Sequence, residues 1–169
     1  MVRSLTDSDL GLFGAHRSAL KSKQRALNIN ASVASMLVSH DIYKGKMTTK
    51  YTCEIFFNDY HESSTRTIRK SGKNWRLGGN KIDDKNFSVL DSRDFALIRS
   101  IENNDGTHPI EIVFISKVQQ SKTHKKIVRL VEPTIKGSMA LYREDSAGFS
   151  DLAEMFPTKK RRARVPKVK

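Results

Sequence analysis

The chain has 169 residues, a size that suits one domain with a core built without disulfide bonds. Its net charge of +13 and pI near 10.0 indicate an anionic partner, either nucleic acid or a membrane surface. The single cysteine, Cys53, excludes a disulfide framework and a four-cysteine zinc site. No stretch approaches the ~20 apolar residues of a membrane span, and the N-terminus lacks the apolar core of a signal peptide, so we expect a soluble, cytoplasmic protein.

Part of the positive charge lies in the last eleven positions. The basic residues there are Lys159, Lys160, Arg161, Arg162, Arg164, Lys167 and Lys169. Thirteen net positive charges less these seven leave about +6, so the excess is not confined to the tail. We predict one domain over residues 1–156 and a basic tail or linker over residues 157–169, which either adds salt-sensitive affinity for nucleic acid or is simply solvated.

Near the N-terminus, alternating apolar and polar residues at positions 1–5 predict an edge strand. Residues 6–18 have the Asp and Gly punctuation of an ordered loop that Leu12 and Phe13 can anchor. From residue 10 through residue 40 there is no Asp or Glu. The cationic and hydrogen-bonding side chains in this stretch include His16, Arg17, Ser18, Lys21, Lys23, Gln24 and Arg25. This pattern favours a binding arm, with a plain surface loop as the alternative.

The next elements are short. Residues 26–29 predict a strand, and Asn30 is a good N-cap for a helix over residues 31–38. The narrow apolar stripe of that helix is typical of core packing and consists of Val33, Met36 and Leu37. Residues 39–50 are predicted to form a loop.

Residues 51–57 alternate at the two-residue period of a half-buried strand, and Phe56 alone departs from the alternation. At Asn58 the apolar pattern stops, and a polar, cationic segment continues to Arg76. No carboxylate occurs from residue 63 through residue 82. A strand that feeds such an excursion could hold it against a polyanion, and a solvated surface loop is the alternative.

Trp75, the only tryptophan, lies at the end of this segment in the sequence WRLGGN. Two roles stay equally open, namely stacking on a base or sugar and closing one end of a barrel. Gly78 and Gly79 predict a tight turn or a bulge where the chain re-enters the sheet. They do not form a phosphate-binding glycine loop, because the strand–turn–helix context is missing.

The second half of the chain is rich in apolar runs. Strands are predicted at residues 95–101, 110–116 and 127–131, with a possible extension at Tyr142 and Arg143. The Asp-Gly pair within residues 103–109 is typical of a hairpin, and Pro133 ends the third strand. An extended or turn segment is predicted at residues 86–92 and a short helix at residues 149–156. Six or seven short strands with one or two helices indicate a mainly β, barrel-like domain.

No catalytic or metal site is expected. The five histidines are scattered without metal-ligand spacing, and the sequence has no HExxH, nucleophile elbow or P-loop. Glu111 and Lys117 are too far apart for a Mg²⁺-dependent nuclease motif, and Glu54 has no Lys two residues later. We therefore expect no enzyme activity and no cofactor in this chain.

Three segments in this order carry a resemblance to a known family: VRSLTDSDLGLFGAHRS, EIFFNDYHESSTRTIRKSGKNWRLGG and VLDSRDFALIRSIE. Over roughly residues 2–118 the chain resembles the DNA-recognition domain of EcoRII-type restriction endonucleases, which is similar to the recognition domains of phospholipase-D-type restriction enzymes. The resemblance implies a B3-like, seven-stranded open pseudobarrel. It also implies a target-recognition module for duplex DNA with a linked or associated nuclease domain, and no membrane partner.

In that family two loops, the N-arm and the C-arm, clasp the major groove and read base edges. By resemblance the N-arm is residues 9–25 and the C-arm residues 58–76, the two segments that composition also singles out. The implied N-arm contacts are Asp9, His16, Arg17, Ser18, Lys21, Lys23, Gln24 and Arg25. The implied C-arm contacts are Asn58, Asp59, Tyr60, His61, Glu62, Ser64, Thr65, Arg66, Arg69, Lys73, Asn74, Trp75 and Arg76.

Residue chemistry suggests a role for each class of contact. Arg can bind guanine, Asn and Gln can pair with adenine, and a carboxylate can accept from cytosine N4, so Asp59 and Glu62 are candidates for reading cytosine. Their alternative role is in a turn or in an internal salt bridge that holds Arg66 or Arg69. The remaining cations are expected to contact phosphate and set the register, namely Lys21, Lys23, Arg69, Lys70 and Lys73.

Two other functions compete with this one. An RNA-binding or ribosome-associated basic β-barrel would stack unpaired bases on sheet aromatics, but the aromatics here lie in strands that look buried. A complete Mg²⁺-dependent nuclease is the second, for which the sequence offers no matching carboxylate motif.

Overall fold

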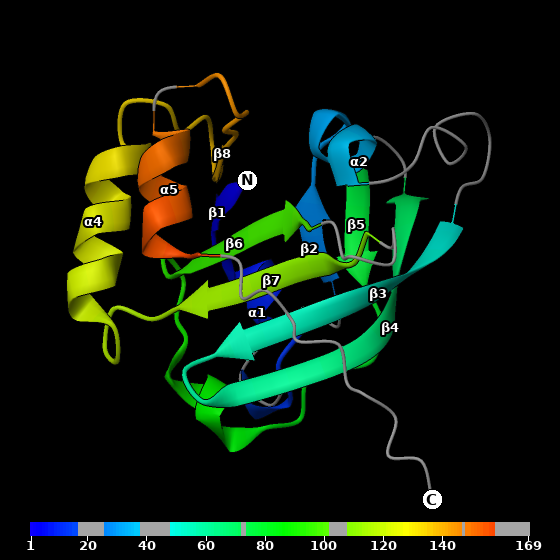
Figure 1. Ribbon diagram of the computed structural model, residues 1–169. Coiled ribbons are helices and arrows are strands. Elements are labelled where there is room, and N and C mark those ends of the chain that lie inside the picture. Colours follow the sequence, from blue (N-terminus) through cyan, green and yellow to red (C-terminus); the bar gives the residue numbers. More distant parts are fainter. Residues whose placement is uncertain (17–25, 38–47, 72–73, 102–107, 147, 158–169) are drawn as a thin grey trace, which may run out of the picture.

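The computed structural model describes residues 1–16, 26–37, 48–71, 74–101, 108–146 and 148–157 (Figure 1). Within these residues, eight strands form one curled half-barrel sheet in the order β2-β5-β4-β3-β7-β6-β1-β8. The strands are β1 Val2–Ser4, β2 Ala26–Ile29, β3 Thr48–Phe57, β4 Tyr60–Ser71, β5 Asn74–Gly78, β6 Phe95–Ser100, β7 Ile110–Ile115 and β8 Met139–Ala140. The predicted mainly β, open pseudobarrel is confirmed, with one strand more than the seven expected.

The helices of the described residues also outnumber the one or two predicted. They are α1 Asp7–Leu10, α2 Ala31–Leu37, α4 Ser121–Val131 and α5 Phe149–Met155, with short 3₁₀ turns η1 Gly14–His16 and η2 Lys85–Val89. The N-cap of α2 is as predicted, because Asn30 Oδ1 accepts a hydrogen bond of 2.8 Å from the backbone nitrogen of Val33. The predicted helix near the C-terminus is also confirmed as α5.

Strand β3 lies near the middle of the sheet. It pairs antiparallel with β4 over its whole length and parallel with β7 on its other side. Strand β7 in turn pairs antiparallel with β6, whose connection through residues 102–107 lies outside the described residues. Strands β6 and β7 are buried over most of their length, as the apolar runs at 95–101 and 110–116 predict.

Apolar side chains pack on both faces of this sheet. The first core lies on the inner face and is built around four phenylalanine rings with centroids about 5–6 Å apart, from Phe13, Phe57, Phe87 and Phe114. Leu12 and Phe13 are both buried there, so the loop anchors predicted for residues 6–18 are confirmed. The second core lies on the other face at the β6 end, where α4 and α5 cover Phe95, Leu97 and Ile115 (Figure 1).

Three predictions of strand position are wrong. Residues 127–131 belong to α4, because His124, Ile127 and Val131 share one buried helical face that the short apolar run conceals. The strand proposed at Tyr142 and Arg143 is instead β8, three residues earlier. The N-terminal strand β1 is not an edge strand, because it pairs with β6 on one side and with β8 on the other.

Candidate nucleic-acid interface

The segment predicted as the C-arm is not a loop. The chain turns at Asn58 and Asp59, where Asn58 has the positive φ of 52° that a two-residue hairpin requires, and then runs as β4 for 12 residues. A strand of that length spans about 36 Å, so its two ends lie far apart. The cationic excursion is therefore part of the sheet, and β5 completes it after residues 72–73, which lie outside the described residues.

Alternation along β4 divides the predicted contact residues between two faces. One set of side chains points away from the inner core and is exposed or half-buried, and we call it the outer row: His61, Ser63, Thr65, Thr67 and Arg69. The other set points toward the inner core and comprises Tyr60, Glu62, Ser64, Arg66 and Ile68. The predicted C-arm residues thus cannot all face one ligand.

Neighbouring strands extend the outer row at its Arg69 end. Thr67 pairs with Lys50 of β3, and Arg69 pairs with Arg76 of β5, whose neighbour on β2 is Asn28. Arg76 Nε and Asn28 Oδ1 are buried and have no hydrogen-bond partner within the described part of the chain.

The opposite end of the outer row holds an imidazole in a fixed orientation. His61 Nε2 lies 2.6 Å from Oε2 of Glu54, a carboxylate that is 1% exposed, while the His61 side chain is 45% exposed. Ser63 Oγ donates to Glu54 Oε1 at 2.8 Å, and the ring of Phe56 stacks on His61 at 4.5 Å. His61 therefore presents a polar edge to solvent while its own position is determined by β3.

On the inner face, Arg66 is a buried residue whose partners lie inside the chain. Its side chain is 3% exposed, Nη2 donates to Glu62 Oε1 at 3.1 Å, and Nη1 donates to the backbone oxygen of Asn80 at 2.9 Å. Gly79 packs against it, and a Cβ at that glycine would meet Arg66 Cγ at 3.2 Å. The alternative of an internal salt bridge is what the structure has, and this arrangement does not favour the contact with DNA predicted for Arg66.

Glu62 belongs to the same network. Burial of its carboxyl opposes ionisation, but the Tyr60 hydroxyl, which donates to Oε2 at 2.7 Å, and the Arg66 guanidinium outweigh it and hold the pKa of Glu62 below its ordinary value. Burial and the adjacent carboxylate raise the pKa of Tyr60. Both side chains are engaged with each other, which disagrees with the cytosine-reading role predicted for Glu62.

The remaining C-arm residues are also dispersed. Trp75 is 7% exposed within the inner core, which favours a structural role over base stacking. Asn58 and Asp59 are exposed at the β3–β4 turn, where Asn58 Nδ2 donates to Gln119 Oε1. Asn74 is exposed beside Arg76 on β5. Ser64 points inward, and Lys73 lies outside the described residues.

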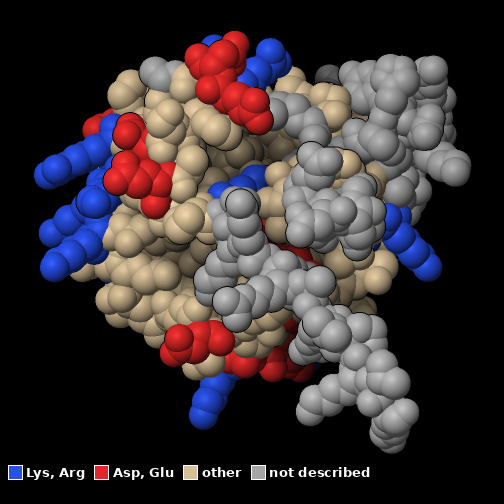
Figure 2. All heavy atoms as spheres, in the orientation of Figure 1, with Lys and Arg blue, Asp and Glu red and all other residues tan. Residues whose placement is uncertain are grey.

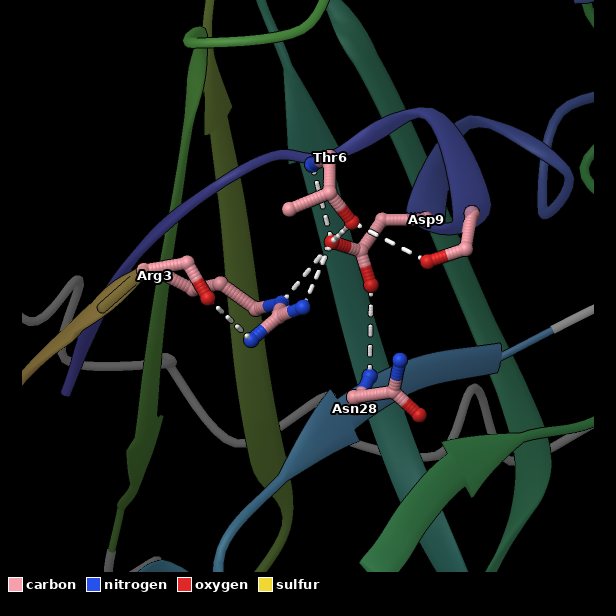
Figure 3. A network of polar contacts seen from close by, with 6 residues as sticks. Arg3, Thr6, Asp9 and Asn28 are labelled. Atoms are coloured by element: carbon pink, nitrogen blue, oxygen red, sulfur yellow. Dashed lines mark hydrogen bonds and ion pairs between the residues drawn. The ribbon is translucent and has the colours of Figure 1, made fainter.

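The first residue of the predicted N-arm, Asp9, is fully buried (Figure 3). Its Oδ2 accepts from Arg3 Nε and Nη2 at 2.9 and 2.7 Å, and from Thr6 Oγ1 at 2.7 Å. Its Oδ1 accepts from the backbone nitrogen of Asn28 at 3.3 Å. Asp9 therefore ties α1 to β1 and to β2, the strand that follows the N-arm, and this burial does not favour its predicted contact with DNA.

His16 is the only other predicted N-arm contact in the described part of the chain. Its Nε2 lies 3.0 Å from the backbone oxygen of Phe87, and its ring packs on the edge of Phe13, so it is half-buried against the core. The other predicted contacts lie outside the described residues, namely Arg17, Ser18, Lys21, Lys23, Gln24 and Arg25.

Sequence reasoning missed several surface residues. Lys50, Ser63 and Thr67 belong to the outer row or its flank, and the strand register that groups them with Arg69 was not considered. It also missed a row of four exposed cations on α4, which Figure 2 shows along the edge of the molecule where that helix lies. Their spacing of three and four residues is a helical signal, which the strand prediction at 127–131 concealed.

The described residues contain no cluster of three or more His, Cys, Asp or Glu side chains that could hold a metal ion. None of the described helices is long and apolar enough to cross a membrane. Comparison of the chain with family models, with curated proteins and with solved structures gave no significant match.

Proposed function

We propose that this chain binds double-stranded DNA in a sequence-selective way through the outer row of β4 and its flanks on β3 and β5. It would serve as the target-recognition module of a restriction endonuclease whose catalytic domain lies elsewhere. The observation that carries the proposal is the alternation of β4, which directs five hydrogen-bonding side chains to one face while the inner face packs on the core.

The outer face of the β4–β5 hairpin could meet a groove of DNA. The major groove of B-DNA is about 12 Å wide and admits side chains that reach the base edges. The hairpin lies between β3 and β2 in the sheet, so only its outer face, which joins Arg69 to Arg76 across the pair, is offered to such a groove. Arginine binds the O6 and N7 atoms of guanine through two hydrogen bonds, and a threonine hydroxyl can bond to any base.

The electrostatics at this end also favour a polyanion. The outer face around Arg69 carries Lys50, Arg76 and the neutral Thr52, Thr65, Thr67 and Asn74, with no carboxylate among the described side chains there. Lys50 is suited to a phosphate contact that sets the register, and Asn74 to an adenine edge.

The inner residues then support the site indirectly. Arg66, Glu62 and Asp9 fix the strands from which the outer row projects, and they are not proposed as contacts. The residues of the N-arm from Arg17 to Arg25 remain part of the proposal by composition and resemblance, as a second contact segment.

A binding-site selection from random duplexes tests this function. We expect enrichment of one short sequence, bound at least ~10³-fold more tightly than random duplex at physiological salt. Single-stranded RNA should compete poorly in the same assay, and plasmid DNA should stay intact with Mg²⁺. Selection of no sequence, or preferential binding of the RNA, would refute the proposal.

A further inference from the structure

The solvent face of α4 carries four cations at positions i, i+3, i+4 and i+7, all exposed, and we call them the α4 stripe: Lys122, Lys125, Lys126 and Arg129. The sequence has no Asp or Glu from residue 112 through residue 131. None of the ion pairs within the described residues involves the stripe. Figure 2 shows basic side chains projecting from the edge of the molecule where α4 lies.

Most of the stripe is unfavourable for the helix itself. Like charges three and four residues apart repel each other along a helix, and Lys122 in the first turn opposes the helix dipole, which favours only Arg129 in the last turn. Beside the start of α4, the exposed Arg93 has a φ of 78°, a left-handed conformation that Gly or Asn adopts with less strain. Charge repulsion, the helix dipole and the backbone conformation thus disfavour cations at several of these positions. Their presence there points to a partner outside the chain.

The stripe is also held rigidly. His124, on the opposite face of α4, lies 3.4 Å from Asp94 and 3.3 Å from the backbone oxygen of Arg93. Ile127 and Val131 are buried in the second core. The four cations are therefore presented on a fixed surface, and ordering them on a partner costs less than ordering a free loop.

The dimensions suit one strand of a nucleic acid duplex. From residue 122 to residue 129 the helix rises about 10 Å. Phosphates follow one another every ~3.4 Å along the axis of each strand, so the stripe spans about three of them. The cations also form a narrow band, because α5 beside α4 carries the exposed acids Asp151 and Glu154 (Figure 1). A rod-shaped polyanion can follow such a band, whereas a flat anionic membrane would also cover the acidic helix.

We propose that the α4 stripe is a second DNA-binding surface, which binds duplex phosphates independently of base sequence and of the outer row of β4. This inference rests on the proposed duplex-binding function. It adds a contact that lies outside both predicted arms.

Anisotropy titrations with a labelled random-sequence duplex over a range of salt concentrations test the stripe. The test variant carries K122Q, K125Q, K126Q and R129Q, since Gln has a similar helix propensity. The matched control removes the same charges at exposed sites elsewhere, through K81Q, K85Q, K136Q and R143Q. A third variant, K50Q/R69Q, removes charges of the proposed sequence-reading face. Thermal melts show whether each variant is folded.

We expect the stripe variant to lose affinity for random duplex about tenfold or more, and its slope of log K against log salt to fall by roughly 2–3 relative to the control. Its preference for the selected sequence should be unchanged. If the stripe variant binds like the matched control while K50Q/R69Q loses binding, the inference fails and the proposed function survives. If wild type binds phosphatidylserine vesicles through the stripe but not duplex, both fail.

Discussion

Arg66 and Arg69 lie three residues apart on β4 and face opposite sides of the sheet. Arg66 is buried and bonded to Glu62 and Asn80, whereas Arg69 is exposed beside Arg76. Composition does not distinguish the two arginines, but the two-residue period of a strand places them on opposite faces of the sheet. The environment of each side chain therefore depends on whether its position is odd or even along the strand, as well as on its residue type.

Replacement of Asp9 should lower the free energy of unfolding strongly. Asp9→Asn keeps the shape but leaves the buried guanidinium of Arg3 without a counter-charge, so we expect a loss of about 3–5 kcal/mol in urea unfolding. Asp7→Asn in the same helix is the control, since Asp7 is exposed and should change stability by less than ~0.5 kcal/mol. Equal effects of the two variants would contradict the structural role of Asp9.

Glu62 should make the stability of the protein depend on pH. Its pKa is lower in the folded chain than the ordinary value of 4.5, so the ionised carboxylate stabilises the fold above that pH and the contribution is lost as the pH falls through the folded pKa. We expect the difference in unfolding free energy between wild type and Glu62→Gln to be constant near neutral pH and to shrink below about pH 4.5. A difference that grows on acidification would be inconsistent with the Tyr60–Glu62–Arg66 network.

The thiol of Cys53 should be unreactive in the folded protein. It is buried on β3, and burial raises the pKa of its thiol to about 12, so almost no thiolate exists at neutral pH. We expect a disulfide reagent such as Ellman's reagent to label Cys53 only after denaturation. Rapid labelling of the native chain at pH 8 would show that β3 is open to solvent at this point.

Among the elements, the sequence of β4 explains why residues 58–76 are predicted as an arm although most of them form a strand. A strand is easiest to recognise when apolar and polar residues alternate, and the first half of β4 is polar on both faces. Of its inner residues there, Tyr60 and Arg66 donate hydrogen bonds to Glu62, and Arg66 also donates to the backbone oxygen of Asn80, just after β5. Such an internal polar network is not visible in a sequence pattern, whereas β3, β6 and β7 follow the apolar pattern and were predicted.

Helix α5 depends on a close approach at its N-cap, Gly148, which has a φ of 88°. A Cβ there would meet Leu130 Cδ1 at 2.8 Å and Tyr142 Cε1 at 3.1 Å. Gly137 has a φ of 63° and no atom within 4 Å of such a Cβ. Its replacement by alanine therefore measures the backbone strain without the clash. We expect Gly137→Ala to cost about 1–2 kcal/mol of unfolding free energy and Gly148→Ala measurably more. Similar losses would mean that α5 does not pack on α4 as closely as described.

For the whole molecule, the fold class could be predicted because several short apolar runs and turn signals repeat along the chain. The surface could be predicted only in part. Composition correctly singled out residues 58–76 as cationic, but which of them share a face depends on the pairing of Thr48 with Arg69 and of Arg69 with Arg76. The pairing of distant strands cannot be predicted from a local sequence pattern, and the buried ion pair between Arg3 and Asp9 cannot be predicted in this way either.

The central claim, that the outer row of β4 contacts duplex DNA, is tested most directly by equilibrium binding of K50Q/R69Q to the selected duplex and to random duplex. The control is K85Q/R143Q, which removes one Lys and one Arg at exposed positions away from the row. We predict that K50Q/R69Q loses about 1–3 kcal/mol of binding free energy on the selected site and has reduced preference over random duplex, while the control keeps that preference. Indistinguishable affinities of the two variants on both duplexes would contradict the claim.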